Sequence, residues 1–177
     1  NYDIADIPLE KLCGPGYALD LTFVCDERKE TDMKVTEDRW ERFSVSGPQI
    51  LPSDIEEWEK RNNVHIEEND IVFLYTRNEV PNIPIVPEKT AKYLVRKRKI
   101  KMIGTNDETI VYGALGHEYF HNKKIPVVEM LTNLEKLGTQ RAYIVALGLR
   151  IKGIGGSPGR IIAYVDKIIG EEEEKKE

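Results

Sequence analysis

The chain of 177 residues has the length of one ordinary domain and can bury a core without disulfide support. Its net charge is −5, of which the acidic tail 171–177 carries −3, and no basic stripe suited to nucleic acid appears in the remainder. No apolar run reaches the roughly 18 residues that span a bilayer, and the amino terminus has no apolar signal region. We therefore expect a soluble cytoplasmic protein with one domain over residues 1–170, no nucleic-acid or membrane partner, and a charged tail.

The first half of the chain contains two expected strands and one expected helix. Residues 16–23 follow a Gly14-Pro15 turn and mix apolar with β-favouring side chains, which predicts a strand. Ser53 and Glu56 have the spacing of a capping box, so we expect a helix to begin there. The continuous apolar run at 70–76 is typical of a buried strand.

Strands and helices alternate in the second half. Pro87-Glu88 opens an expected helix that runs through Val95. The patterns that follow predict a strand at 100–104, a helix at 111–122, a strand at 125–129, a helical turn at 132–137, and strands at 142–149 and 160–165. The sequence therefore indicates a single mixed α/β or α+β domain that is richer in strand than in helix.

The stretch His117-Glu118-Tyr119-Phe120-His121 can be interpreted as a metal site in two incompatible ways. As the H-E-x-x-H helix of a zinc protease, it would use His117 and His121 as ligands and Glu118 as the base. Against this, the expected helix ends just after His121, and the extended pattern with a third histidine is absent. In the second interpretation the ligands are His117 and Glu129. A surface helix with two ordinary histidines is the simplest alternative.

Other motifs give little support for different chemistry. The glycines between Gly153 and Gly159 fit neither common phosphate-binding pattern, so a tight connection between strands is the better interpretation. No G-x-S-x-G elbow surrounds a serine, and neither Cys13 nor Cys25 has the setting of a nucleophile. The short basic run 96–99 is typical of a solvated helix end.

Several short segments, taken together and in order, carry a resemblance to a known family. They are the I-P-L-x-x-L-x-G entry at 7–14, the D-I-V strand at 70–76, the G-x-D-like turn at 103–106, the histidine and glutamate at 117 and 129, E-x-L-x-N-L at 129–134, and G-S-P-x-R at 156–160. This set resembles the cyclase family of metal-dependent hydrolases, which includes bacterial kynurenine formamidase (arylformamidase) and isatin hydrolase.

The resemblance implies a β-rich α/β domain, with helices packed outside the sheets, that hydrolyses an amide or lactam. It implies one or two divalent metal ions, zinc or manganese, that activate water for attack on the carbonyl. His117 and Glu129 would be two of the ligands, and His121 and Glu118 become weaker candidates on a short helix. Arg160 would be an ion-pair partner rather than a catalytic group. Relatives of this kind lead us to expect a homo-oligomer.

Two departures from the family pattern limit what this chain is expected to do alone. The family's H-x-G-T-H-x-D-x-P signature, which supplies most metal ligands and the catalytic histidine, would precede Ile7 and is absent, and Asn106 replaces a usual aspartate. We expect either a fragment of an ordinary hydrolase or an inactive relative that serves as a binding or structural protein, and a start at Asn1 rather than Met favours the fragment. With two ligands, the chain is expected to bind metal weakly and to hydrolyse nothing efficiently.

Overall fold

A computed structural model describes residues 3–27, 47–76, 84–108 and 114–166, without the side chains of 114–116 and 118. In chain order the elements are η1 (Ile4–Asp6), α1 (Leu9–Leu12), β1 (Cys13–Asp20), α2 (Thr22–Glu27), α3 (Pro52–Asn62), β2 (Ile71–Tyr75), α4 (Glu88–Lys92), the π-helical turn η2 (Tyr93–Arg98), β3 (Met102–Thr105), α5 (Ala114–Asn122), β4 (Val127–Val128), η3 (Leu134–Leu137), β5 (Ala142–Gly148) and β6 (Gly159–Tyr164).

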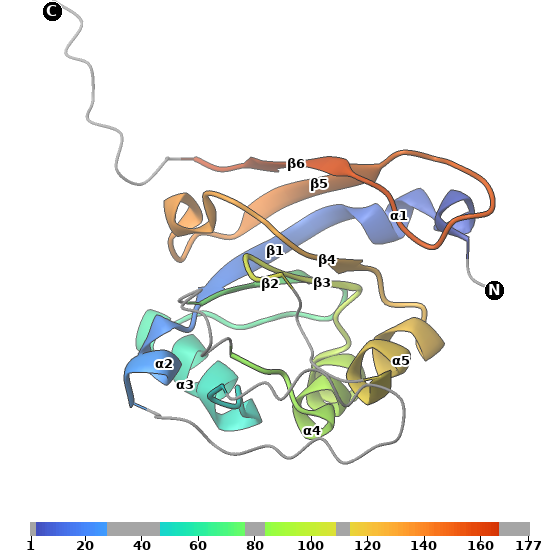
Figure 1. The fold of residues 1–177 in the computed structure, drawn as a ribbon. Helices are drawn as coiled ribbons and strands as arrows, with labels where there is room; N and C mark the ends of the chain where they lie inside the picture. Colours follow the sequence, from blue (N-terminus) through green and yellow to red (C-terminus); the bar gives the residue numbers. More distant parts are fainter. Residues whose placement is uncertain (1–2, 28–46, 77–83, 109–113, 167–177) are drawn as a thin grey trace, which may run out of the picture.

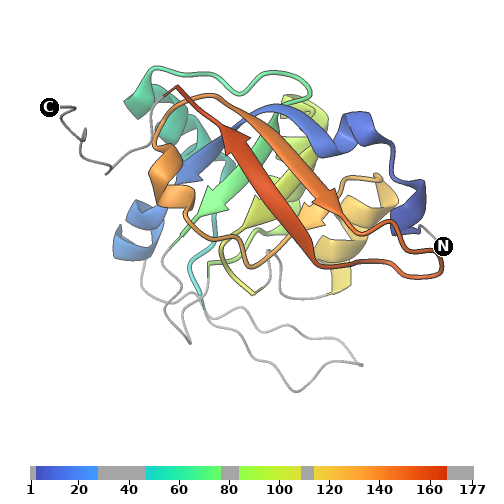
Figure 2. The same cartoon turned by 90° about the horizontal axis from the view of Figure 1, so that it is seen from above.

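One curled sheet organises these elements, with the strand order β4-β3-β2-β1-β5-β6. The strands β1 to β4 are mutually parallel, whereas β5 and β6 run antiparallel to their neighbours. Helices α2 to α5 cover one face of the sheet, and the β5–β6 hairpin curls away above them (Figures 1 and 2). The mixed α/β domain with external helices is therefore confirmed.

The parallel strands bury apolar side chains on both faces, which produces two core clusters. In β2, Val72 and Leu74 contribute to the cluster beneath the helices, and Ile71 and Phe73 contribute to the cluster on the opposite face. This accounts for the continuous apolar run at 70–76, because a strand covered on both sides needs no polar alternation.

Within the described residues, no helix is long and apolar enough to cross a membrane.

Two expected elements of the first half have wrong boundaries. The strand expected at 16–23 is β1, which begins at Cys13, so that Gly14 and Pro15 pair with β5 and do not form the expected turn. It ends at Asp20, whose Oδ1 accepts hydrogen bonds from the backbone N–H (3.0 Å) and the hydroxyl (2.7 Å) of Thr22, so that α2 begins there. Helix α3 begins at Pro52 rather than at Ser53, because Asp54 Oδ2 accepts from the N–H of Leu51 at 2.6 Å. In both cases a carboxylate satisfies backbone donors that a helix start leaves open.

The remaining elements of the second half occur near where the sequence predicts them, with limits that differ by a few residues: the helix expected through Val95 continues as η2 to Arg98, and β6 begins at Gly159. The helix at 111–122 is described from Ala114 onward, and residues 109–113 lie outside the described part. The strand expected at 125–129 is only Val127–Val128, since these two residues alone pair with β3. The turn expected at 132–137 is η3, which ends at Gly138 with a φ of 57°.

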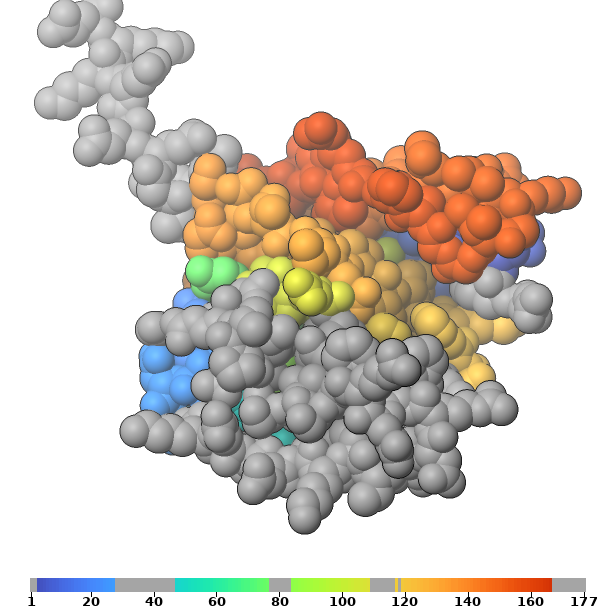
Figure 3. Space-filling view, in the orientation of Figure 1, coloured from blue at the N-terminus to red at the C-terminus, as the bar shows by residue number. Residues whose placement is uncertain are grey.

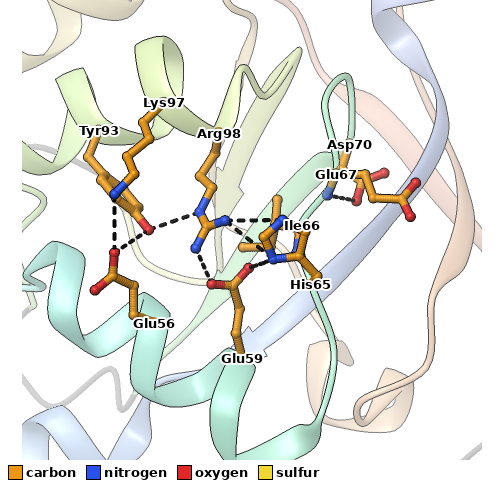
Figure 4. Close-up of polar contacts among 9 residues, drawn as sticks. All are labelled: Glu56, Glu59, His65, Ile66, Glu67, Asp70, Tyr93, Lys97 and Arg98. Carbon is orange, nitrogen blue, oxygen red and sulfur yellow. Dashed lines mark hydrogen bonds and ion pairs between the residues drawn. The ribbon is translucent and has the colours of Figure 1, made fainter.

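A buried ion pair joins α3 to η2 beneath the sheet (Figure 4). The Arg98 guanidinium donates to Glu59 Oε2, and the two side chains are 12% and 8% exposed. Glu59 Oε1 also accepts from the N–H of Ile66 at 2.8 Å, and Arg98 Nε donates to the Tyr93 hydroxyl at 2.9 Å. Burial, and then the bond to Glu56, raise the pKa of Tyr93 to about 12, so this phenol stays protonated and donates.

Removing one partner of the buried pair should destabilise the fold. Arg98→Ala leaves the Glu59 carboxylate buried without its cation, and we expect the free energy of unfolding to fall by about 3–5 kcal/mol. Lys92→Ala is the matched control, because Lys92 pairs with Glu88 at 2.8 Å with both side chains largely exposed, and its loss should cost less than about 1 kcal/mol. Urea denaturation measures both values, and equal losses would contradict the role assigned to Arg98.

A second buried carboxyl group lies where β2 and β3 end. Asp107 is 1% exposed, and its Oδ2 accepts hydrogen bonds from the hydroxyls of Thr76 and, at 3.4 Å, Thr105. Its Oδ1 is buried and has no hydrogen-bond partner among the described residues. Burial raises the pKa of Asp107, and the two threonine bonds oppose that shift without cancelling it.

The raised pKa of Asp107 gives stability a defined pH dependence. The contribution of Asp107 to the free energy of unfolding is fully present below pH 3.8, which is the ordinary pKa of an aspartate. This contribution is lost as the pH rises through the higher pKa of Asp107 in the folded state. Asp107→Asn stays neutral, so relative to the native chain its free energy of unfolding should increase over that pH range. Asp6→Asn, at an exposed position, is the control. Denaturation curves at acidic and neutral pH measure the difference, and a constant difference for Asp107→Asn would contradict the burial effect.

Candidate metal site

Glu129 is positioned by the short strand β4 at the edge of the sheet. Val127 and Val128 pair with Ile103 and Gly104 of β3, and Glu129 follows at once. A Cβ at Gly104 would lie 2.9 Å from the carbonyl oxygen of Val128, so only glycine permits this close approach. Because the strands are parallel, Glu129 lies at the same end of the sheet as the last residues of β2 and β3.

The backbone after Glu129 donates two hydrogen bonds to the end of β3 and the turn that follows it. Met130 N–H donates to the Asp107 carbonyl and Leu131 N–H to the Thr105 carbonyl, each at 3.0 Å. Met130 has a φ of 59°, a left-handed conformation that is uncommon outside glycine. This turn therefore fixes the direction in which the chain leaves Glu129.

Helix α5 supplies the second side chain of the site. Phe120 is fully buried and packs the helix against the core. After the helix ends, the backbone N–H of Ile125 donates to the carbonyl of Phe120 at 2.9 Å. His117, one turn earlier, brings its Nε2 to 3.3 Å from Glu129 Oε1. The two side chains are 36% and 31% exposed, so the pair is accessible from solvent.

The structure thus brings together the two residues of the second interpretation. His121 lies one turn beyond His117 on the same helix, with the ring centroids 5.9 Å apart, and it is exposed. The side chain of Glu118 lies outside the described residues. Metal binding by any of the four remains a prediction, because contact between an imidazole and a carboxylate also occurs in ordinary ion pairs.

The donor chemistry fits part of a metal site. A neutral imidazole nitrogen and a carboxylate oxygen suit zinc or manganese. Among the residues that the structure describes, no group of three or more histidine, cysteine, aspartate or glutamate side chains could hold a metal ion. A catalytic zinc site uses three protein ligands and a water molecule. His117 and Glu129 can therefore contribute two ligands to a site that needs others.

A groove of about 670 Å³ is lined by residues of the segment after β4 and of the β5–β6 hairpin. Its lining is mixed, with apolar side chains such as Phe73, Leu131 and Ile161 and polar ones such as Lys136 and Arg160. Glu129 is among the lining residues. That arrangement can hold the apolar part of a small molecule while presenting a polar group to the His117–Glu129 pair.

The turn after β3 contains a buried polar arrangement that the sequence analysis missed. Asn106 accepts from the N–H of Thr76 and donates to its carbonyl, both at 2.9 Å, so its amide continues the pairing of β2 with β3. An aspartate could not donate in this way. The buried carboxyl group belongs to the next residue, Asp107, which lies two residues after the end of β3, and the sequence of this polar turn gives no signal of its burial.

Comparison with solved structures shows the same fold in proteins with little sequence identity. A protein described as a "Potential Metal-Dependent Hydrolase With Cyclase Activity" shares 24% identity at a TM-score of 0.64, with 89% of this chain and 68% of the other covered. A "predicted metal-dependent hydrolase from Bacillus stearothermophilus" shares 22% at 0.65, covering 91% and 73%. Isatin hydrolase A from Ralstonia solanacearum shares 18% at 0.71, covering 90% and 63%.

Sequence comparison identifies the family. No curated protein matches the chain. The profile of the family described as "Putative cyclase" matches residues 1–110, which is more than half of the chain and includes β1, β2 and β3. The chain belongs to this cyclase family.

Proposed function

We propose that this chain carries part of the active site of a metal-dependent hydrolase that cleaves an amide C–N bond with metal-activated water, as an arylformamidase does. The observation that carries the proposal is the 3.3 Å contact between His117 and Glu129, with Glu129 among the residues that line the groove. Membership of the cyclase family supports it, as do the structural neighbours, which are described as metal-dependent hydrolases and isatin hydrolase.

The roles of the residues follow from their chemistry and position. His117 Nε2 and Glu129 Oε1 would hold a zinc or manganese ion, which when bound supplies a polarised water and a Lewis acid for the carbonyl group. The apolar groove side chains would bind the body of a small amide or lactam and exclude water around it. The Met130 turn keeps Glu129 directed toward His117 by fixing the backbone behind it.

A second candidate function is a binding or structural homologue without catalytic activity. It is favoured by the count of two metal-ligating side chains in the described part of the chain, where catalysis needs more. The codons that precede Asn1 distinguish the two. An in-frame H-x-G-T-H-x-D-x-P would supply further ligands and support the hydrolase, whereas a start codon directly before Asn1 would favour the inactive homologue.

Metal binding gives a direct test of the two ligands. We expect His117→Ala and Glu129→Gln each to weaken Zn²⁺ or Mn²⁺ binding to the chain by at least about tenfold, because each removes a donor atom. Titration calorimetry with each metal, or competition with a chromogenic chelator, measures the affinity.

Two matched variants examine the zinc-protease alternative in the same experiment. His121→Ala and Glu118→Gln change neighbouring residues of α5 and should leave metal affinity within about threefold of the native value, since independent sites contribute separately. If His121→Ala abolishes binding while Glu129→Gln does not, the H-E-x-x-H interpretation replaces the present one.

A homo-oligomer is also proposed for this protein, because family resemblance leads us to expect one. The hydrolase site described above does not require it.

A further inference from the structure

Three buried polar side chains meet where β2 and β3 end. Thr76, Thr105 and Asp107 are each at most 2% exposed, and both hydroxyls donate to Asp107 Oδ2. The other oxygen, Oδ1, is buried without a hydrogen-bond partner among the described residues, which costs free energy. Buried polar groups that break the packing rules of a core are commonly found at functional sites, and the roles proposed for His117 and Glu129 leave Asp107 without one.

Residue 107 is bonded at its N–H, at its side chain and at its carbonyl. The N–H donates to Thr105 Oγ1 at 3.2 Å, and the carbonyl accepts from the N–H of Met130 at 3.0 Å. Between these two backbone bonds, the side chain accepts the bond from Thr76, which directly follows β2. The Asp107 side chain therefore ties to β2 the residue whose carbonyl receives the segment after β4.

The segment after Glu129 depends on that carbonyl to keep its conformation. In Figure 3 the yellow surface of the turn after β3 lies directly beside the orange surface of this segment. Met130 has a φ of 59°, a conformation that costs free energy for a side chain other than glycine. Its side chain is 64% exposed, so packing does little to hold it there. The bond from its N–H to Asp107 is therefore what stabilises the turn next to Glu129.

The other residue of the candidate pair is held by a different part of the fold. His117 lies on α5, and Phe120 of the same helix packs in the core cluster beneath the helices. Phe73 and Leu131, which flank the corner formed by β2, β3 and the segment after β4, belong to the cluster on the opposite face of the sheet. Loosening this corner would therefore move Glu129 relative to a fixed His117 and lengthen their 3.3 Å contact.

We propose that Asp107 is a positioning residue for the candidate site. Its buried side chain, bonded to Thr76 and Thr105, holds the carbonyl that stabilises the Met130 turn, and the turn directs Glu129 toward His117. Asp107 acts through the backbone and has no contact of its own with a metal ion or a substrate. The inference rests on the proposed function for its effect on metal binding, whereas its effect on the turn can be measured in the chain without metal.

Amide hydrogen exchange, followed by NMR without metal, tests the turn. Asp107→Ala removes the acceptor of the threonine hydroxyls, so the Met130 amide should exchange at least about tenfold faster than in the native chain. The Ile66 amide, which donates to Glu59 beneath the sheet, is the internal control and should change by less than about threefold. Asp107→Asn keeps an acceptor oxygen and should leave the Met130 amide within about threefold of its native rate.

Two further variants separate positioning from general stability. Thr76→Val keeps the shape of the side chain and removes the hydroxyl, so it should accelerate exchange of the Met130 amide by at least about threefold. Arg98→Ala lowers stability at the buried ion pair and should show the reverse pattern, with faster exchange at Ile66 than at Met130. Equal acceleration of both amides by Asp107→Ala, or an unchanged Met130 amide in both Asp107→Ala and Thr76→Val, overturns the proposal.

Zn²⁺ titration extends the comparison to the site. Asp107→Ala should weaken Zn²⁺ binding by at least about fivefold, while Asp107→Asn and Arg98→Ala, measured where each is folded, should stay within about threefold of the native affinity. Unchanged affinity in Asp107→Ala, when His117→Ala and Glu129→Gln weaken binding, overturns the positioning role and leaves the proposed function standing. If His117→Ala and Glu129→Gln leave binding unchanged, the proposed function fails, and the Met130 exchange rate alone decides the role of Asp107.

Discussion

Two hydrogen bonds that the segment after β4 donates to the end of β3 and the turn after it determine where the candidate site lies. Leu131 donates to the carbonyl of Thr105, and Met130 donates to the carbonyl of Asp107. Because only two residues of β4 pair with β3, these bonds extend the contact between the two segments past the end of β4. Without them, nothing in the short β4 would fix the direction of Glu129. The buried Asp107 supports the same corner, because its side chain accepts from Thr76 and Thr105 and so ties the ends of β2 and β3 together.

Sequence patterns predicted the elements whose signal comes from burial. The run at 70–76 is buried on both faces in β2, and the turn at 132–137 stops at a glycine with positive φ, as the sequence indicates. The errors arose where a local side chain decides the boundary. Residues 22 and 23 have β-favouring character, yet Asp20 captures the backbone of Thr22 and begins a helix. Such competition between a cap and a strand is invisible to periodicity.

The site was only partly accessible to sequence reasoning, for a different reason. The helical spacing of His117 and His121 is a local pattern, whereas the contact between His117 and Glu129 depends on how α5 returns to the sheet edge. Family resemblance suggested that pair, and no spacing rule could have done so. Asp107 was not predicted as a notable residue, because it is distinguished only by its complete burial. Acidic residues in polar turns are usually exposed, so the sequence gives no sign of this burial before the fold is known.

Strand β6 forms part of the lining of the groove. Ile161 and Ala163 of β6, and Val165 just after the strand ends, line it together with Phe73 and Leu131. Among the described strands, β6 pairs with β5 alone. An edge strand held on one side alone can fray, since each backbone bond is exposed to water. An apolar ligand in contact with Ile161 and Ala163 would favour the ordered conformation of β6, because those contacts are lost when the strand frays.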